Sequence, residues 1–217
     1  MPPLRTLSET MAALRHELSA PLRSMYDDLV RQLTKTTTAE GTVTRGDVFP
    51  EFALPDTEGR FTLLSELLQR GPLVINFYRG QWCPFCSATI EAMSAATPAI
   101  SAAGATVIGI SPELGNLSFS ASRKQDLNFT MLCDLDNGVA LQCGLVFRMT
   151  DDIIQDYLAD GFDLAQVYGN GSWFLPIPAC YIVMPSGAIS WAYVNPDFRY
   201  RMDPEEILHA VEELRSR

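Results

Sequence analysis

Two cysteines, Cys83 and Cys86, lie three positions apart in the segment "FYRGQWCPFCS", directly after an apolar run. At the start of a helix, free backbone N–H groups and the positive end of the dipole favour a thiolate at Cys83, and the thiolate is the nucleophilic form. Cys86 would lie one helical turn further on, so either sulfur could reach the other and close a small disulfide ring. The pair therefore predicts redox chemistry.

A zinc site and an inert buried pair are the weaker alternatives. Zinc needs further ligands at suitable spacing, but nine residues separate Cys133 from Cys143, Cys180 stands alone, and the two histidines lie near opposite ends of the chain. We expect no metal and no bound cofactor, because sulfur itself performs the chemistry.

Composition narrows the class of protein. The chain has 217 residues, 47% of them apolar, which is enough for one sizeable core. A net charge of -10 without a long basic cluster argues against nucleic acid and anionic membranes. The sequence shows no secretion signal pattern and no stretch of membrane-spanning length, and five cysteines cannot all pair within one chain. We therefore expect a cytoplasmic protein with small substrates or protein partners.

The elements that position the cysteines alternate between strand and helix. Strands are expected at 73–79, 105–111 and 129–134, helices at 86–104, 118–127 and 138–146, a hairpin at 179–194, and a closing helix at 203–217 capped by Asp203. A parallel βαβ start with an antiparallel finish predicts an α/β fold: a mixed sheet with helices on both faces. For residues 150–175 we expect one short helix and a Gly/Asn-rich loop.

The chain divides near residue 45. Residues 1–45 place apolar side chains at helical spacing with a break suggested by Pro21, which predicts a helical extension of two helices, and residues 46–217 form the main domain. The extension either packs on its own domain or forms the arm of a homodimer.

Three segments carry a family resemblance: "FYRGQWCPFC", "DLDNGVALQCG" and "PIPACYIVMPSGAISWAYV". Together they resemble the peroxiredoxin-like branch of the thioredoxin superfamily, often grouped as the alkyl hydroperoxide reductase/thiol-specific antioxidant family. The resemblance covers residues 46 to 215 and implies a thioredoxin-like fold. It also implies reduction of hydrogen peroxide or small organic hydroperoxides, with electrons from a thioredoxin- or glutathione-type reductant.

The resemblance gives two answers about which sulfur attacks. The peroxiredoxin pattern P-x-x-x-[TS]-x-x-C, laid on the chain from Phe77 and Tyr78, places the attacking cysteine at Cys86. Thioredoxins attack with the first cysteine of the pair, which is Cys83 here. We assign both as redox residues and expect Cys83 to attack, because its position at the helix end is the more exposed one.

Two positions depart from the family pattern. The proline of the peroxiredoxin motif is Arg79 here, and the family's peroxide-activating arginine matches Pro178. A peroxidase needs positioned donors to stabilise the departing oxygen. We expect Arg79 to supply them and to lower the pKa of a neighbouring cysteine; the alternative is an arginine paired with a surface carboxylate. The thioredoxin resemblance implies instead that Pro178 has a cis peptide bond and lies beside the sulfurs.

Other candidates are weaker. Cys180 is either core or close to the pair, Cys143 is core or a resolving thiol, and Cys133 is core. Arg199 and Arg201 are expected on a solvated face, with carboxylate binding or partner docking as the alternative.

Three functions follow from these residues. The first is a thiol peroxidase that closes a Cys83–Cys86 disulfide. The second is a thioredoxin-type oxidoreductase that attacks protein disulfides, which the missing family proline and arginine favour. The third is a non-catalytic redox sensor in which the disulfide changes a dimer of the N-terminal helices. The peroxidase is our prediction.

Overall fold

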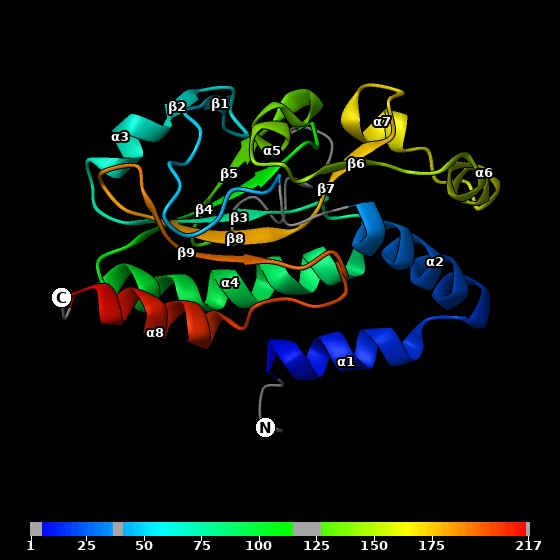
Figure 1. Ribbon diagram of the computed structural model, residues 1–217, viewed down its shortest axis with the longest axis horizontal. Helices are drawn as coiled ribbons and strands as arrows, with labels where there is room; N and C mark the ends of the chain where they lie inside the picture. The colour runs from blue at the N-terminus through cyan, green and yellow to red at the C-terminus, as the bar shows by residue number, and fades with distance from the viewer. Residues whose placement is uncertain (1–5, 37–40, 115–126, 216–217) are drawn as a thin grey trace.

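A five-stranded mixed sheet forms the centre of the computed structural model, which describes residues 6–36, 41–114 and 127–215 (Figure 1). The strands are β3 (Leu73–Phe77), β4 (Thr106–Ser111), β5 (Thr130–Cys133), β8 (Ala179–Val183) and β9 (Ile189–Val194). Their order in the sheet is β5-β4-β3-β8-β9. β3 pairs in parallel with β4 and antiparallel with β8, so the predicted mixed sheet is confirmed.

Helices cover both faces of this sheet, as predicted (Figure 1). All five residues of β3 are buried, and a strand buried on both faces needs a layer on each side. Alternate strand residues enter two separate apolar clusters, Val74 on one face and Ile75 on the other. One face packs against α4 (Pro84–Ala102) and α8 (Pro204–Arg215), and the other against α3 (Leu64–Leu68) and α5 (Gly138–Gln142).

The helix after β3 begins where the sequence predicted a junction. Cys83 is the N-cap of α4 with extended backbone angles, φ -90° and ψ 117°. Pro84 occupies the first turn, where a missing N–H removes no helical hydrogen bond. The chain therefore turns from strand to helix at the first cysteine of the pair.

The N-terminal residues form two helices, α1 (Leu7–Glu17) and α2 (Ala20–Thr36). The break between them falls just before Pro21, close to the predicted point. Their apolar side chains, including Met11 and Leu29, are buried in the same cluster as α4. The extension thus packs on its own chain, the first of the two expected arrangements. None of the helices in the described part of the chain is both long enough and apolar enough to cross a membrane.

The segment 150–175 differs from the expectation of a single short helix. It contains α6 (Asp151–Ala159), α7 (Leu164–Tyr168) and strand β7 (Phe174–Pro176), which pairs with β6 (Val146–Arg148). The second helix was missed because five residues are too few to show a helical period. It is defined by its ends: Asp163 accepts a hydrogen bond from the N–H of Ala165 at 2.9 Å, and the chain leaves it through Gly169.

The remaining predicted elements agree with the structure where it describes them. β8 and β9 form the predicted hairpin, and the carboxylate of Asp203 accepts a hydrogen bond from the N–H of Glu205 at 3.2 Å at the start of α8. The expected helix at 118–127 lies almost wholly outside the described residues. A short hairpin of β1 (Ala53–Pro55) and β2 (Phe61–Leu63) and a 3-10 turn, η1 (Leu135–Asn137), complete the described elements.

Candidate active site: the Cys83–Cys86 pair

Both sulfurs of the pair are inside the protein. The side chains of Cys83 and Cys86 are each 0% exposed. The expectation that Cys83 is the more exposed of the two is therefore wrong. The reason is tertiary: an aromatic layer that includes Tyr26 of α2 and Phe198 of the β9–α8 loop belongs to the cluster that encloses the start of α4.

A buried carboxylate fixes the turn between β3 and α4. Gly80 has φ +137°, a conformation that favours glycine, and a Cβ there would lie 2.3 Å from the carboxyl carbon of Glu113. The N–H of Gln81 donates to both carboxylate oxygens of Glu113, at 3.0 Å each. Glu113 follows β4, the parallel neighbour of β3, so the turn is anchored to the adjacent strand end.

Arg79 places its guanidinium on the first cysteine. Its Nη2 donates a hydrogen bond to Sγ of Cys83 at 3.0 Å, and its side chain is 0% exposed. The guanidinium carbon lies 3.7 Å from the ring centroid of Phe198. The backbone carbonyl of Arg79 accepts hydrogen bonds from Trp82 Nε1, at 3.1 Å, and from the hydroxyl of Tyr168. The alternative of a surface arginine is thus wrong, and the expected contact with a cysteine is present.

The surroundings favour the thiolate at Cys83. Burial alone would raise the pKa of Cys83, but a hydrogen bond from the Cys86 thiol, the charges of Arg79 and Arg201, and the backbone N–H of Cys86 lower it well below the ordinary range. The pKa of Arg79 is raised in turn, because the negative charges of Cys83 and Cys86 outweigh the cost of burial. The geometry and the charges around Arg79 and Cys83 therefore favour a buried guanidinium–thiolate pair.

Cys86 has the opposite character. Burial, its hydrogen bond to Cys83 and the negative charge of Cys83 raise the pKa of Cys86 well above the ordinary range, and Arg201 and Arg79 only partly offset this. Nη2 of Arg201 lies 3.6 Å from Sγ of Cys86. The prediction of a solvated face is wrong for both arginines of this loop. Arg199 is 11% exposed and bonds to carboxylates, and Arg201 has a buried Nε and contacts Cys86.

Several buried donors around the two sulfurs have no hydrogen-bond partner among the described residues. They are Nε and Nη1 of Arg79, Nε of Arg201 and the hydroxyl of Tyr78. Burial raises the pKa of Tyr78 well above its ordinary value, the charges of Cys180 and Cys86 raise it further, and the charge of Arg201 partly offsets this. An unmade buried hydrogen bond costs about 1–3 kcal/mol, so such groups are rare. Their gathering at one place suits a small ligand that presents oxygen atoms.

Pro178 does not have the predicted form. It is buried and precedes Ala179, which pairs with Phe77 at the end of β3. The peptide bonds of the described residues are all trans, so the expected cis bond is wrong. The chain runs through Pro178 directly from β7 into β8, and trans is the form that an X–Pro bond prefers by about 0.5–1 kcal/mol.

The other three cysteines lie in different surroundings. Cys180 is buried in the same cluster as the pair, and burial raises the pKa of its thiol. Cys143 belongs to the cluster on the opposite face of the sheet, where burial, aided by the charge of Asp134, raises the pKa of its thiol to about 12. The thiol of Cys133 donates to the carbonyl of Glu113 at 2.8 Å. Cys143 is thus core, separated by the sheet from the pair.

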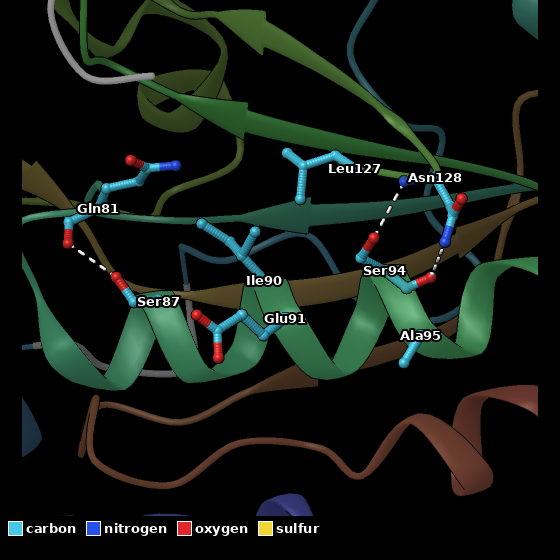
Figure 2. Close-up of a pocket in the computed structure, with 8 residues that line it drawn as sticks. All are labelled: Gln81, Ser87, Ile90, Glu91, Ser94, Ala95, Leu127 and Asn128. Atoms are coloured by element: carbon cyan, nitrogen blue, oxygen red, sulfur yellow. Dashed lines mark hydrogen bonds between the residues drawn. The ribbon is translucent and has the colours of Figure 1, made fainter. Parts of the chain in front are cut away.

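A pocket of about 390 Å³ lies along α4 next to the turn (Figure 2). Figure 2 shows Ile90 and Leu127 facing each other across it, and the hydroxyl of Ser87 donating to the carbonyl of Gln81 at 2.8 Å. The described lining residues include neither sulfur. A molecule in this pocket therefore reaches the turn before Cys83 but does not touch the thiol.

The sequence left several of these residues unassigned. Glu113, Phe198 and Tyr26 were missed, and Arg201 was placed on the surface. Glu113 could have been predicted from its position. It follows one of two parallel strands, and residues that follow neighbouring parallel strands lie at the same edge of the sheet. Phe198 and Tyr26 carried no such signal, since apolar residues in a helix or a loop are ordinary core residues.

Comparison with known protein families and sequences gives consistent matches. A profile described as the AhpC/TSA family matches residues 45–192. "Putative peroxiredoxin Q, chloroplastic" from Oryza sativa subsp. indica is 34% identical over 155 residues, which cover 71% of this chain and 61% of that protein. "Peroxiredoxin Bcp" from Escherichia coli strain K12 is 31% identical over 100 residues, or 46% of this chain and 64% of that protein. The alignments thus span less than two thirds of either relative.

Solved structures agree on the fold. The structure of peroxidoxin BcpB from Mycobacterium tuberculosis superposes with a TM-score of 0.59 and 18% identity, over 79% of this chain and 98% of that chain. At such identity the likeness concerns the fold alone. It confirms the thioredoxin-like fold predicted from the sequence.

Proposed function

This chain belongs to the AhpC/TSA family, and from that premise we propose that it is a thiol peroxidase that reduces hydrogen peroxide or small organic hydroperoxides through Cys83 and Cys86. The observation that carries the proposal is the 3.0 Å hydrogen bond from Arg79 to Sγ of Cys83. A fully buried guanidinium without a carboxylate partner among the described residues needs an anion, and the Cys83 thiolate is that anion.

In the first step the Cys83 thiolate attacks one peroxide oxygen. The S–O bond forms and the O–O bond breaks, the sulfur is oxidised by two electrons to a sulfenic acid, and the departing hydroxide or alkoxide takes up a proton. Charge moves from sulfur to the departing oxygen, so donors that already point at the site stabilise the transition state. The unpartnered Nε and Nη1 of Arg79 are such donors.

In the second step Cys86 loses its proton and attacks the sulfenic sulfur of Cys83. The S–S bond forms, the S–O bond breaks, and the released hydroxide takes up a proton to become water. A reduced dithiol of the thioredoxin type, or two molecules of a thiol such as glutathione, then returns both cysteines to the thiol form. The resetting needs a reducing compartment such as the cytoplasm, which five cysteines also favour.

Burial of both sulfurs favours a small substrate over a large one. In the reduced protein both sulfurs are buried, and hydrogen peroxide is far smaller than a protein disulfide, which can react only with a sulfur at the surface. This favours peroxidase activity over the thioredoxin-type oxidoreductase. The oxidoreductase remains the second candidate, because the family's peroxide-activating arginine matches Pro178 here.

A single-turnover reaction of the reduced protein with one equivalent of hydrogen peroxide tests the proposal. We expect oxidation much faster than that of free cysteine, with sulfenic acid trapped at Cys83 in Cys86→Ser and no fast reaction in Cys83→Ser. Cys143→Ser, on the other face of the sheet, is the matched control. A rate no better than free cysteine together with rapid reduction of a protein disulfide would establish the oxidoreductase. A change of oligomeric state on oxidation, without turnover of peroxide, would establish the non-catalytic redox sensor, which would function as a dimer of this chain.

A further inference from the structure

The loop between β9 and α8 brings a second guanidinium to the pair. Nη2 of Arg201 lies 3.6 Å from Sγ of Cys86, across 115 positions of sequence. Nη1 of the same side chain donates to the carbonyl of Tyr200 at 2.9 Å and to the carbonyl of Phe198. The guanidinium is thus held by its own loop with one edge turned to the sulfur.

Arg201 differs from its neighbour Arg199 in the groups that compensate its charge. Arg199 bonds to Asp27 at 2.6 Å and to Asp197 at 2.8 Å. Within the described residues Arg201 forms no ion pair, and its buried Nε has no hydrogen-bond partner. A partly buried cation beside a sulfur and without a carboxylate stabilises negative charge on that sulfur.

The N-terminal helices hold this loop in place. Nη1 of Arg15, in α1, donates to the carbonyl of Arg199 at 3.1 Å, and its guanidinium lies 4.3 Å from the ring centroid of Tyr200. From α2, the ring of Tyr26 packs edge-on against Phe198 at 5.0 Å. The position of Arg201 therefore depends on the extension outside the common family core.

We propose that Arg201 is a further catalytic residue, whose guanidinium stabilises the thiolate of Cys86 each time Cys86 carries the charge. This happens twice in the cycle. Cys86 is the attacking thiolate when the S–S bond forms and the S–O bond of the sulfenic acid breaks, and it is the leaving thiolate when a reducing dithiol attacks the Cys83 sulfur of the disulfide. The first role rests on the proposed peroxidase function, whereas the second requires only the disulfide.

The two arginines act at different stages because the charge of the pair moves. While Cys83 is a thiolate, its charge is one of the causes that keep Cys86 protonated. A sulfenic acid at Cys83 is neutral, so this repulsion disappears, and the attraction of Arg201 for a Cys86 thiolate remains. Oxidation of Cys83 thereby promotes ionisation of Cys86 at the moment when the second thiolate is needed.

The substitution Arg201→Gln tests this role through disulfide closure. An opposite charge at this range shifts a pKa by about one to three units, and the greater nucleophilicity of a more basic thiolate recovers about half of the loss. We expect closure of the disulfide from the Cys83 sulfenic acid to be about three- to thirtyfold slower at neutral pH, with its pH midpoint moved upward. Rapid-quench alkylation and mass spectrometry follow the closure.

A second arm makes the test independent of peroxide. The disulfide is formed with diamide, and its reduction by dithiothreitol is timed, with the same variant expected to be slower because Cys86 is a poorer leaving group. Failure of the peroxidase proposal leaves this arm intact. Arg148→Gln removes an equal charge from an exposed side chain and is the matched control.

Two outcomes would overturn the proposal. One is an Arg201→Gln variant with wild-type closure and reduction rates. The other is a variant that is slower without any shift of its pH profile, since a purely structural role slows the reaction at every pH. Arg201→Lys keeps the charge without the planar fork, so we expect an intermediate rate with a near wild-type midpoint. If the glutamine variant does not fold, Arg201→Met, which also removes the charge, takes its place, and an unshifted pH midpoint for disulfide closure in that variant decides against the role.

Discussion

Nη2 of Arg79 donates a hydrogen bond to Sγ of Cys83 at 3.0 Å, and both side chains are fully buried. A buried guanidinium or thiolate without a partner of opposite charge would destabilise the folded protein, because an isolated buried charge is costly. A guanidinium and a thiolate in contact compensate each other's charge. In the peroxidase that we propose, this thiolate is also the nucleophile, so the charge used for catalysis also stabilises the buried arginine.

Removing the charge of Arg79 should raise the pKa of Cys83. Loss of an opposite charge in contact shifts a pKa by about one to three units. Arg79→Gln also removes the donors positioned for the departing oxygen, so we expect its reaction with peroxide to be about tenfold or more slower at neutral pH. The measurements are the pH dependence of thiolate ultraviolet absorbance and the single-turnover rate. Arg148→Gln serves again as the charge-matched control, and an unshifted Cys83 titration in Arg79→Gln would refute the ion pair.

The lowered pKa of Cys83 also predicts a pH-dependent stability. Between its folded pKa and the ordinary thiol value of about 8.5, the unfolded chain binds more protons at this position than the folded chain. The stabilisation is therefore complete above about pH 8.5 and is lost as the pH falls through the folded pKa. We expect the free energy of unfolding of the reduced protein, relative to Cys83→Ser, to rise with pH over this interval. Urea denaturation at several pH values measures it, and a flat difference would argue against a thiolate.

Gly80→Ala should disturb the turn before the pair. A Cβ at Gly80 would lie 2.3 Å from the carboxyl carbon of Glu113. The alanine backbone would also have to keep φ +137°, which residues with a side chain rarely adopt. Strain and overpacking of this kind each cost about 1–3 kcal/mol, and we expect the variant to lose at least that much stability and to react more slowly with peroxide. Gly161→Ala is the control, since Gly161 also has positive φ, +78°, but open space around it. Equal decreases in the free energy of unfolding for both variants, measured by urea denaturation, would show that the Glu113 side chain moves aside at no energetic cost.

Leu29→Ala tests whether the N-terminal helices belong to the same cooperative unit as the site. Leu29 is 1% exposed within the cluster that includes the pair, so its truncation should lower the free energy of unfolding by about 2–5 kcal/mol in a single transition. Leu158→Ala, at a half-exposed position of α6, should cost much less. Separate transitions by far- and near-ultraviolet circular dichroism, with only one of them shifted, would mean that the extension unfolds on its own.

The sequence was a good guide wherever the signal was local. Cys83 and Cys86 share one helical turn, and the apolar run of β3 ends just before them, so a redox pair at a strand–helix junction could be predicted. The hairpin of β8 and β9 had a clear turn between two apolar strands. The helix α7 was missed because its five residues are shorter than the period that would reveal it.

The sequence was a poor guide to exposure. Cys83 was expected to be accessible because helix ends often are, but α2 and the β9–α8 loop supply Tyr26 and Phe198 to the cluster around it. Arg201 was expected on a solvated face because its neighbours are polar. Neither error was visible locally, since the covering residues are distant in the chain.

Local sequence is enough to specify that two thiols lie at the start of a helix near an arginine, and that strands and helices alternate around them. These features depend on residues close together in the chain, whose backbone preferences and spacing act locally. The packing of the whole chain buries both sulfurs, brings Arg79 into a hydrogen bond with Cys83, and places Arg201 against Cys86, 115 positions earlier in the chain. This could not be read locally, because burial and the pKa of a thiol depend on every charge and surface packed around it, whatever its place in the sequence.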